Sequence, residues 1–144
     1  MKITAILCAE HAVFHNLFDH IEATAPRLAT LAEVRSVASL LETLLCAHSR
    51  TEDELLIEPL EHCFEQIGHR ETFHDEHDGI EQELAGVQRV RTLKAARKLL
   101  LAAVESARHH LDKEERIVFP MAERVLKAKT LLSLGADWSK RRQS

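Results

Sequence analysis

Hydrophobic side chains recur every three or four residues through most of the chain, which is the spacing of one face of an α-helix. The first such pattern predicts a helix over residues 3–25, which Pro26 closes. Thr30 and Glu33 have the spacing of a capping box, a signature of a helix N-terminus. They open a second pattern, which predicts a long helix that ends near Ile67.

Two further patterns predict a third helix over about residues 70–91 and a fourth helix that begins after Thr92. The connections are short, so consecutive helices should lie antiparallel. We therefore predict an all-α fold, an up-down-up-down four-helix bundle, over residues 1–130. Residues 131–144 are expected to form a short C-terminal helix, folded back over the end of the bundle, followed by a basic tail at residues 140–142.

Two prolines interrupt this pattern at comparable places, Pro59 in the second predicted helix and Pro120 in the fourth. Proline removes one backbone donor and crowds the preceding turn, so each should kink its helix. The 144 residues include four Gly and three Pro, with 45% hydrophobic and 29% charged side chains. This balance is typical of one helical globular domain and argues against a turn-rich sheet protein or a disordered chain.

Charge is unevenly placed along the chain. The formal net charge of -4 gives no general attraction to nucleic acid or to an anionic membrane. Residues 50–88 hold twelve acidic side chains and two basic ones, whereas residues 89–129 hold eleven basic and five acidic ones. We expect neighbouring helices of opposite charge that attract one another. A basic face that binds a partner is the alternative.

Three cysteines, Cys8, Cys46 and Cys63, include no C-x-x-C pair, so neither a disulfide framework nor a cysteine-type zinc site is expected. We expect Cys8 and Cys46 to be small buried apolar side chains, with a redox-active thiol beside a metal as the alternative. The N-terminal apolar run is too short for a signal peptide, and no window approaches the roughly 18 consecutive apolar residues of a membrane span. A cytoplasmic protein is expected.

Polar residues repeat along the chain. The dipeptide at residues 10–11, Glu-His, returns at residues 76–77, and the segment 48–54 resembles the segment 110–116. The two offsets, 66 and 62 residues, are each about the length of one helical hairpin. The bundle is therefore expected to consist of two similar hairpins related by a pseudo-twofold axis, which would create symmetric sites.

The repeat contains pairs of histidine and glutamate four residues apart, and these side chains can bind metal ions. His48 and Glu52 lie on one face of the second predicted helix, and His110 and Glu114 lie on one face of the fourth. Each pair can form half of a metal site. Buried carboxylates without a partner are costly, whereas carboxylates between metal ions are satisfied. We therefore expect cations between the helices.

His11 and His77 add one imidazole from each of the two remaining helices, among apolar neighbours such as Phe14 and Ile80. Imidazole together with carboxylate suits iron, zinc or manganese. Zinc is less attractive because its sites are usually four-coordinate. No nucleotide-binding motif, no tyrosine and no Ser-His-Asp arrangement accompanies the cluster. A metal-dependent binding role is therefore favoured over catalysis by side chains alone.

With these motifs the sequence resembles the hemerythrin-like HHE cation-binding domains over about residues 3–128. The resemblance implies four helices around a non-haem di-iron centre, in which two carboxylates bridge two iron ions, with or without an oxo or hydroxo bridge, and about five histidines complete the shell. Carried over position by position, the implied ligands are His11, His48, Glu52, His77, His110 and Glu114.

The fifth histidine of the implied ligand set is less obvious from the motifs. We expect His74, three residues before His77 on the same side of the helix, and His15, one turn after His11, is the rival. The invertebrate oxygen carriers of the family have a histidine at the position of Phe73. This departure implies an altered metal position. The oxygen carriers also have H-x-x-x-x-D where this chain has His110-x-x-x-Glu114, so the chain resembles more closely the bacterial repair-type and eukaryotic iron-sensing domains.

Three functions remain open at this point. The first is a di-iron protein that binds or senses O2, NO, peroxide or iron, with signalling through a separate protein partner. The second is a di-iron enzyme that consumes peroxide or NO, or that supplies iron for the repair of damaged iron centres. The third is a metal-free interaction module, which would dock a partner through the acidic third helix or the basic tail at residues 140–142.

Overall fold

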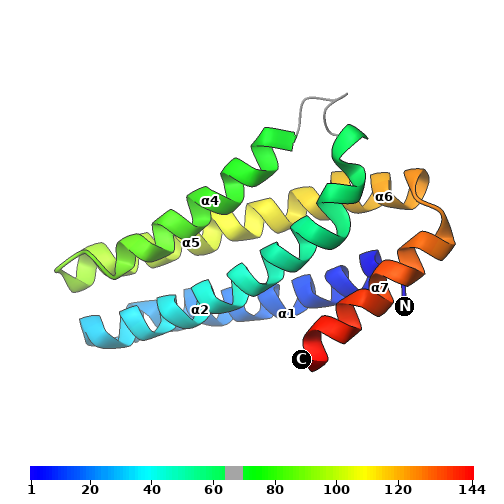
Figure 1. The fold of residues 1–144 in the computed structure, drawn as a ribbon. Helices are drawn as coiled ribbons and strands as arrows, with labels where there is room; N and C mark the ends of the chain where they lie inside the picture. The colour runs from blue at the N-terminus through cyan, green and yellow to red at the C-terminus, as the bar shows by residue number, and fades with distance from the viewer. Residues whose placement is uncertain (64–69) are drawn as a thin grey trace.

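Four long helices lie side by side along most of the molecule (Figure 1). The computed structural model describes residues 1–63 and 70–144 of the chain. Within these residues there is no strand, which confirms the all-α fold class. The four helices are α1 (Ile3–Thr24), α2 (Leu31–Glu52), α4 (Arg70–Val87) and α5 (Leu93–Lys113).

The helix ends lie close to the places that the sequence predicts. A 3-10 turn that contains Pro26 follows α1 directly. The hydroxyl of Thr30 accepts a hydrogen bond from the backbone N–H of Glu33, so Thr30 caps α2. Thr92 caps α5 in the same way. The predicted end of the second helix near Ile67 lies outside the described residues.

Pro59 and Pro120 are each preceded by a short π-helical segment instead of a simple kink. The first segment is Asp53–Ile57 and the second is Glu114–Val118. In both, the residue that follows the segment donates its backbone N–H to a carbonyl five residues earlier. Pro59 and Pro120 each stand two positions after the segment ends. Because proline cannot donate to the α-helical carbonyl four residues back, the hydrogen-bond register changes just before it.

Two further helices complete the chain, α6 (Phe119–Val125) and α7 (Ala128–Gln143). We expected a short helix from residue 131 and then a basic tail, but α7 begins earlier and the basic side chains form its last turn. It folds back along the N-terminal half of α1 (Figure 1). A Cβ atom on Gly135 would lie 2.0 Å from the carbonyl oxygen of Met1, so the two backbones meet there.

The core consists of two apolar clusters with a polar layer between them. One cluster contains the C-terminal half of α1, the N-terminal half of α2, and the parts of α4 and α5 nearest the loop that joins them. The other contains the start of α1 and both π-helical segments, together with Phe73 at the start of α4. Helices α1 and α4 each reach both clusters, and α2 and α5 reach the second cluster through the π-helical segments that follow them. The directions alternate, as the predicted up-down-up-down topology requires.

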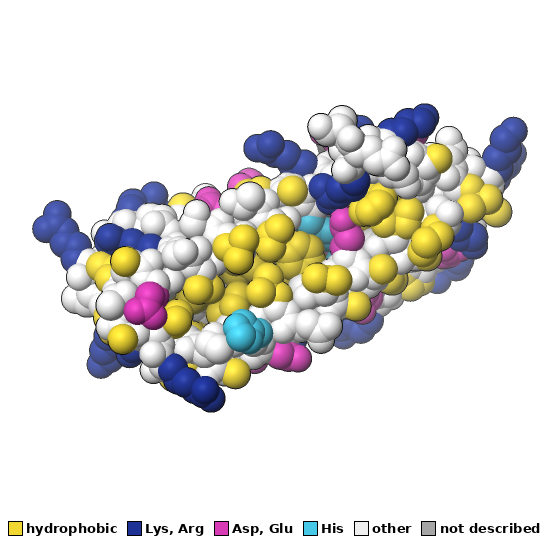
Figure 2. All heavy atoms as spheres, turned by 90° about the horizontal axis from the view of Figure 1, so that it is seen from below, with side chains coloured by type: hydrophobic (Ala, Val, Ile, Leu, Met, Phe, Trp, Pro, Cys, Tyr) yellow, Lys and Arg dark blue, Asp and Glu magenta, His cyan; other side chains and the backbone are white. Residues whose placement is uncertain are grey.

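The surface agrees with the charge pattern of the sequence. Acidic α4 lies against basic α5, and Lys113 binds Glu76 across their interface at 2.7 Å. The face seen from below has hydrophobic side chains gathered in its middle, with basic side chains around the edge (Figure 2). Exposed large hydrophobic side chains of the described residues include Val13, Leu40 and Leu44. No helix in the described part of the chain is both long enough and apolar enough to cross a membrane.

Candidate metal centre

Six polar side chains from all four long helices and the second π-helical segment fill the layer between the two apolar clusters. Each exposes 7% of its surface or less. They form two overlapping groups of four, and within each group the possible ligand atoms all lie within 4.8 Å of one another. The first group is His11, His48, Glu52 and Glu114, and the second is Glu52, His77, His110 and Glu114.

The two glutamates belong to both groups and face imidazoles on both sides. One oxygen of Glu114 lies 3.3 Å from Nε2 of His11, and the other lies 2.5 Å from Nε2 of His110. Oε2 of Glu52 lies 3.7 Å from Nε2 of His48 and 3.9 Å from Nε2 of His77. A carboxylate placed in this way can bridge two metal ions.

A second carboxylate lies against the outer nitrogen, Nδ1, of every imidazole. The pairs are His11 with Glu115 at 3.0 Å, His48 with Glu10 at 2.7 Å, His110 with Glu76 at 2.6 Å and His77 with Asp53 at 3.4 Å. In the pairs of His11, His48 and His110, which are hydrogen bonds, an ionised carboxylate can only accept, so Nδ1 carries the proton and Nε2 presents its lone pair to the interior. This is the arrangement of a histidine prepared to bind a metal.

The inward-facing atoms lack hydrogen-bond partners within the described residues. Both carboxylate oxygens of Glu52 and of Glu114 are buried and unpaired, as is Nε2 of His110. Nε2 of His11 and Nε2 of His48 lie only 3.2 Å apart, so their lone pairs would face each other. Buried polar atoms without partners are costly, and cations placed among these donors would satisfy them all. The residues present therefore fit a metal centre.

The pKa values show the same need for positive charge. Burial raises the pKa of Glu52 well above its usual range, and the nearby Glu114 carboxylate raises it further. Burial also opposes the charged form of Glu114, but the three imidazoles beside it, those of His11, His110 and His77, hold its pKa well below the usual range. Burial lowers the pKa of His77, yet Asp53 and Glu114 outweigh this effect and raise it to about 9. Metal would replace the protons held here.

Two histidines considered for a fifth imidazole lie outside both groups. His74 was our choice, but its side chain is 46% exposed and its Nδ1 lies 3.9 Å from Asp53. Three residues turn an α-helix by about 300°, which moves His74 off the inner face. The inner position beside His77 is taken by Phe73, which is buried. His15, the rival, lies with Asp112 and Glu115 in a more exposed group.

The expectation of buried cysteines beside the site is wrong. Cys8 is exposed, and Cys46 is half-buried, with its thiol donating to Glu81 at 3.3 Å. Burial and Glu81 raise the pKa of Cys46 to about 11, and burial and Glu115 raise the pKa of Cys8. Thiolates are the reactive form, so these surroundings also speak against redox-active thiols.

The sequence contained a signal for the outer carboxylates that we did not use. Glu10 and Glu76 are part of the repeated Glu-His dipeptide, and Asp53 and Glu115 follow the two repeated glutamates directly. The repeat marks these four residues, but it does not show which histidine each carboxylate supports. A repeat that extends beyond the ligands themselves indicates which residues support those ligands.

A narrow apolar pocket leads to the centre between α2, α4 and α5. Half-buried polar residues, Glu42, Ser49 and Glu81, line it together with apolar side chains such as Leu84. Three of the site's imidazoles, those of His48, His77 and His110, also line it. The free volume of this pocket is about 10 Å³, which is close to what a single water molecule needs.

The comparisons with known proteins agree with this geometry. The family model of the hemerythrin HHE cation-binding domain matches residues 2–122. The chain belongs to this family. The hemerythrin HHE match covers both hairpins and both glutamates, and the buried histidine and glutamate groups can hold metal. The searches of curated proteins and of solved structures found no match.

Proposed function

We propose that this protein binds two iron ions, one in each group of four ligands, and through them binds a small ligand such as O2, NO or peroxide. The observation that carries the proposal is the pair of overlapping groups that share Glu52 and Glu114. His11 and His48 would hold one ion, and His77 and His110 the other. The two glutamates would bridge the ions.

The donor set supports iron over other metals. Two imidazoles together with carboxylate oxygens, with positions left open, are typical of non-haem iron sites. Four protein donors would complete the usual tetrahedral shell of zinc and leave no position for a ligand. With iron, positions beyond the four protein donors are free. The metal supplies ligand binding and redox chemistry, and the protein holds the imidazole tautomers and keeps the centre dry.

The pocket supports a small ligand. Its room for about one water-sized molecule excludes bulky substrates unless the helices move. Its apolar lining favours an uncharged ligand, because a charged one would lose its hydration on the way in. O2 and NO fit both conditions, and hydrogen peroxide is only slightly larger.

Metal content per chain tests the proposal. Protein expressed with iron is compared with His48→Ala/His110→Ala, which removes one imidazole from each group. About two irons per chain, together with a visible absorption that the double variant loses, are expected. His15→Ala/His74→Ala is the matched control and should keep both metals. Iron no higher in the native protein than in the double variant would contradict the proposal and favour a metal-free interaction module.

The iron-loaded protein then separates a binder from an enzyme. Sustained consumption of peroxide or NO, or transfer of iron to an iron-free acceptor protein, would identify an enzyme or an iron donor. Stoichiometric binding of NO without turnover would favour a sensor. The sensor is our proposal, because every member of the two described groups would be taken up by metal, which leaves none of them as a free acid or base.

A further inference from the structure

The two halves of the centre are supported in the same way by two outer carboxylates. Oε2 of Glu76 accepts from Nδ1 of His110, and Oε2 of Glu10 accepts from Nδ1 of His48. In both carboxylates the second oxygen accepts from a cationic side chain. The cations are different residues on different helices, so the two supports are not equivalent.

In one half, the cation comes from the bundle itself. Nζ of Lys113, on α5, binds Oε1 of Glu76 at 2.7 Å and lies 4.8 Å from the centre of the Phe73 ring. Lys113 is three residues after His110 on the same helix. This support therefore stays in place as long as the four-helix bundle is folded.

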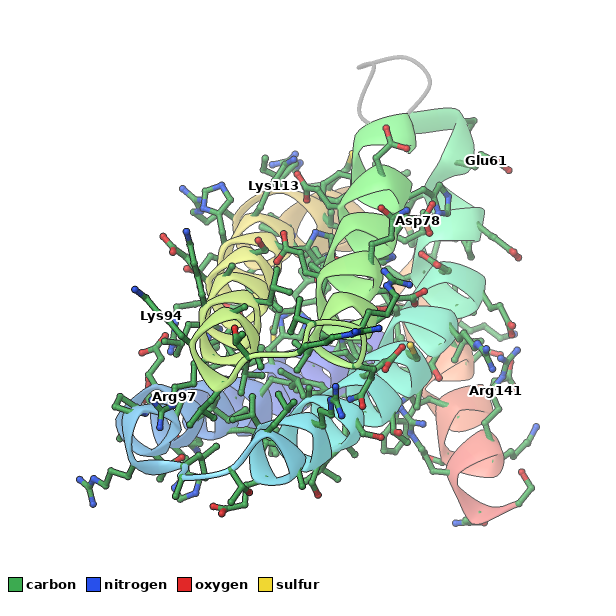
Figure 3. All side chains as sticks on the ribbon, turned by 90° about the vertical axis from the view of Figure 1, so that its left-hand side faces the viewer. Glu61, Asp78, Lys94, Arg97, Lys113 and Arg141 are labelled. Atoms are coloured by element: carbon green, nitrogen blue, oxygen red, sulfur yellow. The ribbon has the colours of Figure 1, made fainter. Side chains whose placement is uncertain are left out.

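In the other half, the cation comes from the C-terminal helix. Nη2 of Arg142, in the last turn of α7, binds Oε1 of Glu10 at 2.9 Å. Its guanidinium lies 5.5 Å from the centre of the Trp138 ring, as Lys113 lies over Phe73. Helix α7 begins after residue 122, where the match to the family model ends. Figure 3 shows Lys113 and Arg141, the residue before Arg142, on opposite sides of the molecule.

We propose that Arg142 is a positioning residue for the metal position formed by His11 and His48, and that the docking of α7 on α1 is coupled to the state of that position. The inference rests on the proposed metal centre. Arg142 holds Glu10, and Glu10 holds His48 with Nε2 toward the interior. Displacement of α7 removes Arg142 from Glu10 and so loosens the metal position of His11 and His48. The metal position of His77 and His110 keeps its support from Lys113.

The structure of α7 allows such displacement. Its contact with the bundle depends on a few buried residues, among them Leu131 and Gly135. The ion pair of Arg141 with Glu54 is exposed, and Arg142 itself is one-third exposed. A helix held mainly by exposed contacts at one end can undock without unfolding the core. Coupling of this kind is reciprocal, so metal or ligand bound at His48 must also change the docking of α7.

Metal titration tests the positioning role. Metal-free protein is titrated with Co²⁺, and Arg142→Met, Arg142→Lys and Lys140→Met are compared with the native chain. The ammonium of Lys140 binds Asp137 within α7 and is the control. Loss of a supporting partner around a metal ligand typically costs about 10-fold to 100-fold in affinity, and for this more distant residue we expect about 3-fold to 10-fold. One of the two Co²⁺ equivalents should weaken in Arg142→Met and change its visible absorption. Arg142→Lys should recover the native affinity and absorption, and Lys140→Met should match the native protein.

A measurement without metal keeps this test separate from the proposed function. The ¹⁵N chemical shifts of the imidazoles in metal-free protein report the tautomer and hydrogen bonding of each histidine. Arg142→Met should change the shifts of His48 and leave those of His110, and Lys113→Met should do the reverse. Unchanged His48 shifts in Arg142→Met would overturn the proposal whether or not the protein binds iron.

The reverse direction of the coupling has its own probe. Trp138 is the single tryptophan of the chain and lies in α7, so its fluorescence reports the docking of that helix. Adding Co²⁺ should reduce acrylamide quenching of Trp138 in the native protein, and Glu10→Gln should abolish this response. Quenching that does not respond to bound metal would refute the coupling, even if Arg142 positions His48.

Discussion

At the scale of single residues, each outer carboxylate supports a histidine on another helix. Glu10 stands next to His11 in the chain but accepts from His48, and Glu76 stands next to His77 but accepts from His110. The repeated Glu-His dipeptide therefore connects helices rather than completing one ligand. Removing one such carboxylate should disturb a ligand that is distant in sequence.

Glu76→Gln tests this cross-helix support. The amide cannot accept from both His110 and Lys113 as a carboxylate does, so His110 should lose the fixed tautomer that aims Nε2 inward. We expect metal affinity to fall by about 10-fold to 100-fold, measured by competition with a chelator. Glu83→Gln is the control on the same helix, because Glu83 binds only Ser106 among the contacts of the described residues. An equal loss in both variants would mean a general effect of charge.

Metal binding should strengthen as the pH rises. The pKa of His77 is raised to about 9, so this residue holds a proton at neutral pH in the metal-free protein, and burial raises the pKa of Glu52 in the same direction. Ligands must be deprotonated, so each released proton makes the apparent affinity rise by about tenfold per pH unit below the pKa. Chelator competition between pH 6 and pH 9.5 measures the slope. Affinity independent of pH would show that these protons are not displaced.

At the scale of elements, the amphipathic pattern predicts where helices lie but not how their hydrogen bonds change register. The helix caps at Thr30 and Thr92 were confirmed because a cap is a local sequence signal. The prolines predicted a disturbance in the right places, but the π-helical segments depend on both the proline and the packing of the next turn. His74 lies off the inner face for a related reason, since a spacing of three residues only approximates one face.

Thr92→Ala tests a cap that lies far from the metal. Its hydroxyl accepts from the backbone N–H of Ala95 at 3.2 Å, and loss of such a cap costs about 1 kcal/mol. Urea unfolding should show this loss of stability with unchanged metal content. Thr43→Ala is the control, because Thr43 is exposed inside α2 and alanine favours the helix. A stability loss as large in Thr43→Ala would rule out capping as the cause.

The pocket between α2 and α4 predicts a kinetic effect. Ser49 lines it and is half-buried, so Ser49→Phe should narrow the path without touching a metal ligand. We expect slower NO binding to the iron-loaded protein, by about tenfold or more, which corresponds to about 1.4 kcal/mol in the barrier, with the same final occupancy. Stopped-flow absorption measures the rate, and Ser39→Phe, on an exposed turn of the same helix, is the control. An unchanged rate would place the path elsewhere.

At the scale of the whole molecule, the bundle buries a polar layer between two apolar clusters, and the burial of its unpaired polar atoms is unfavourable. The sequence showed this layer because histidines and glutamates interrupt the hydrophobic face of four helices at matching depths. It did not show the path of α7, because no motif marks Gly135 as a contact with the N-terminus and Arg142 as a contact with Glu10. Contacts between distant segments depend on the assembled fold, whereas the candidate ligands are visible in the sequence as a repeat.

The cost of this layer predicts opposite effects of Glu52→Met with and without metal. In chelator at pH 7.5 the variant should equal the native protein or exceed it by about 1 to 4 kcal/mol in unfolding free energy, because an apolar side chain of similar size replaces a buried carboxylate without partners. A raised carboxyl pKa makes the folded state bind more protons, so the native protein loses stability as the pH rises above the usual range of glutamate.

With saturating ferrous iron the order should reverse, because the native protein gains free energy from a bound metal that the variant holds weakly. Urea unfolding in both conditions measures the two differences. Glu105→Met, on an exposed part of α5, is the control and should stay within about 0.5 kcal/mol in either condition. If Glu52→Met were less stable than the native chain in chelator, the carboxylate would be stabilised by the protein itself, and the need for metal at the centre would be removed.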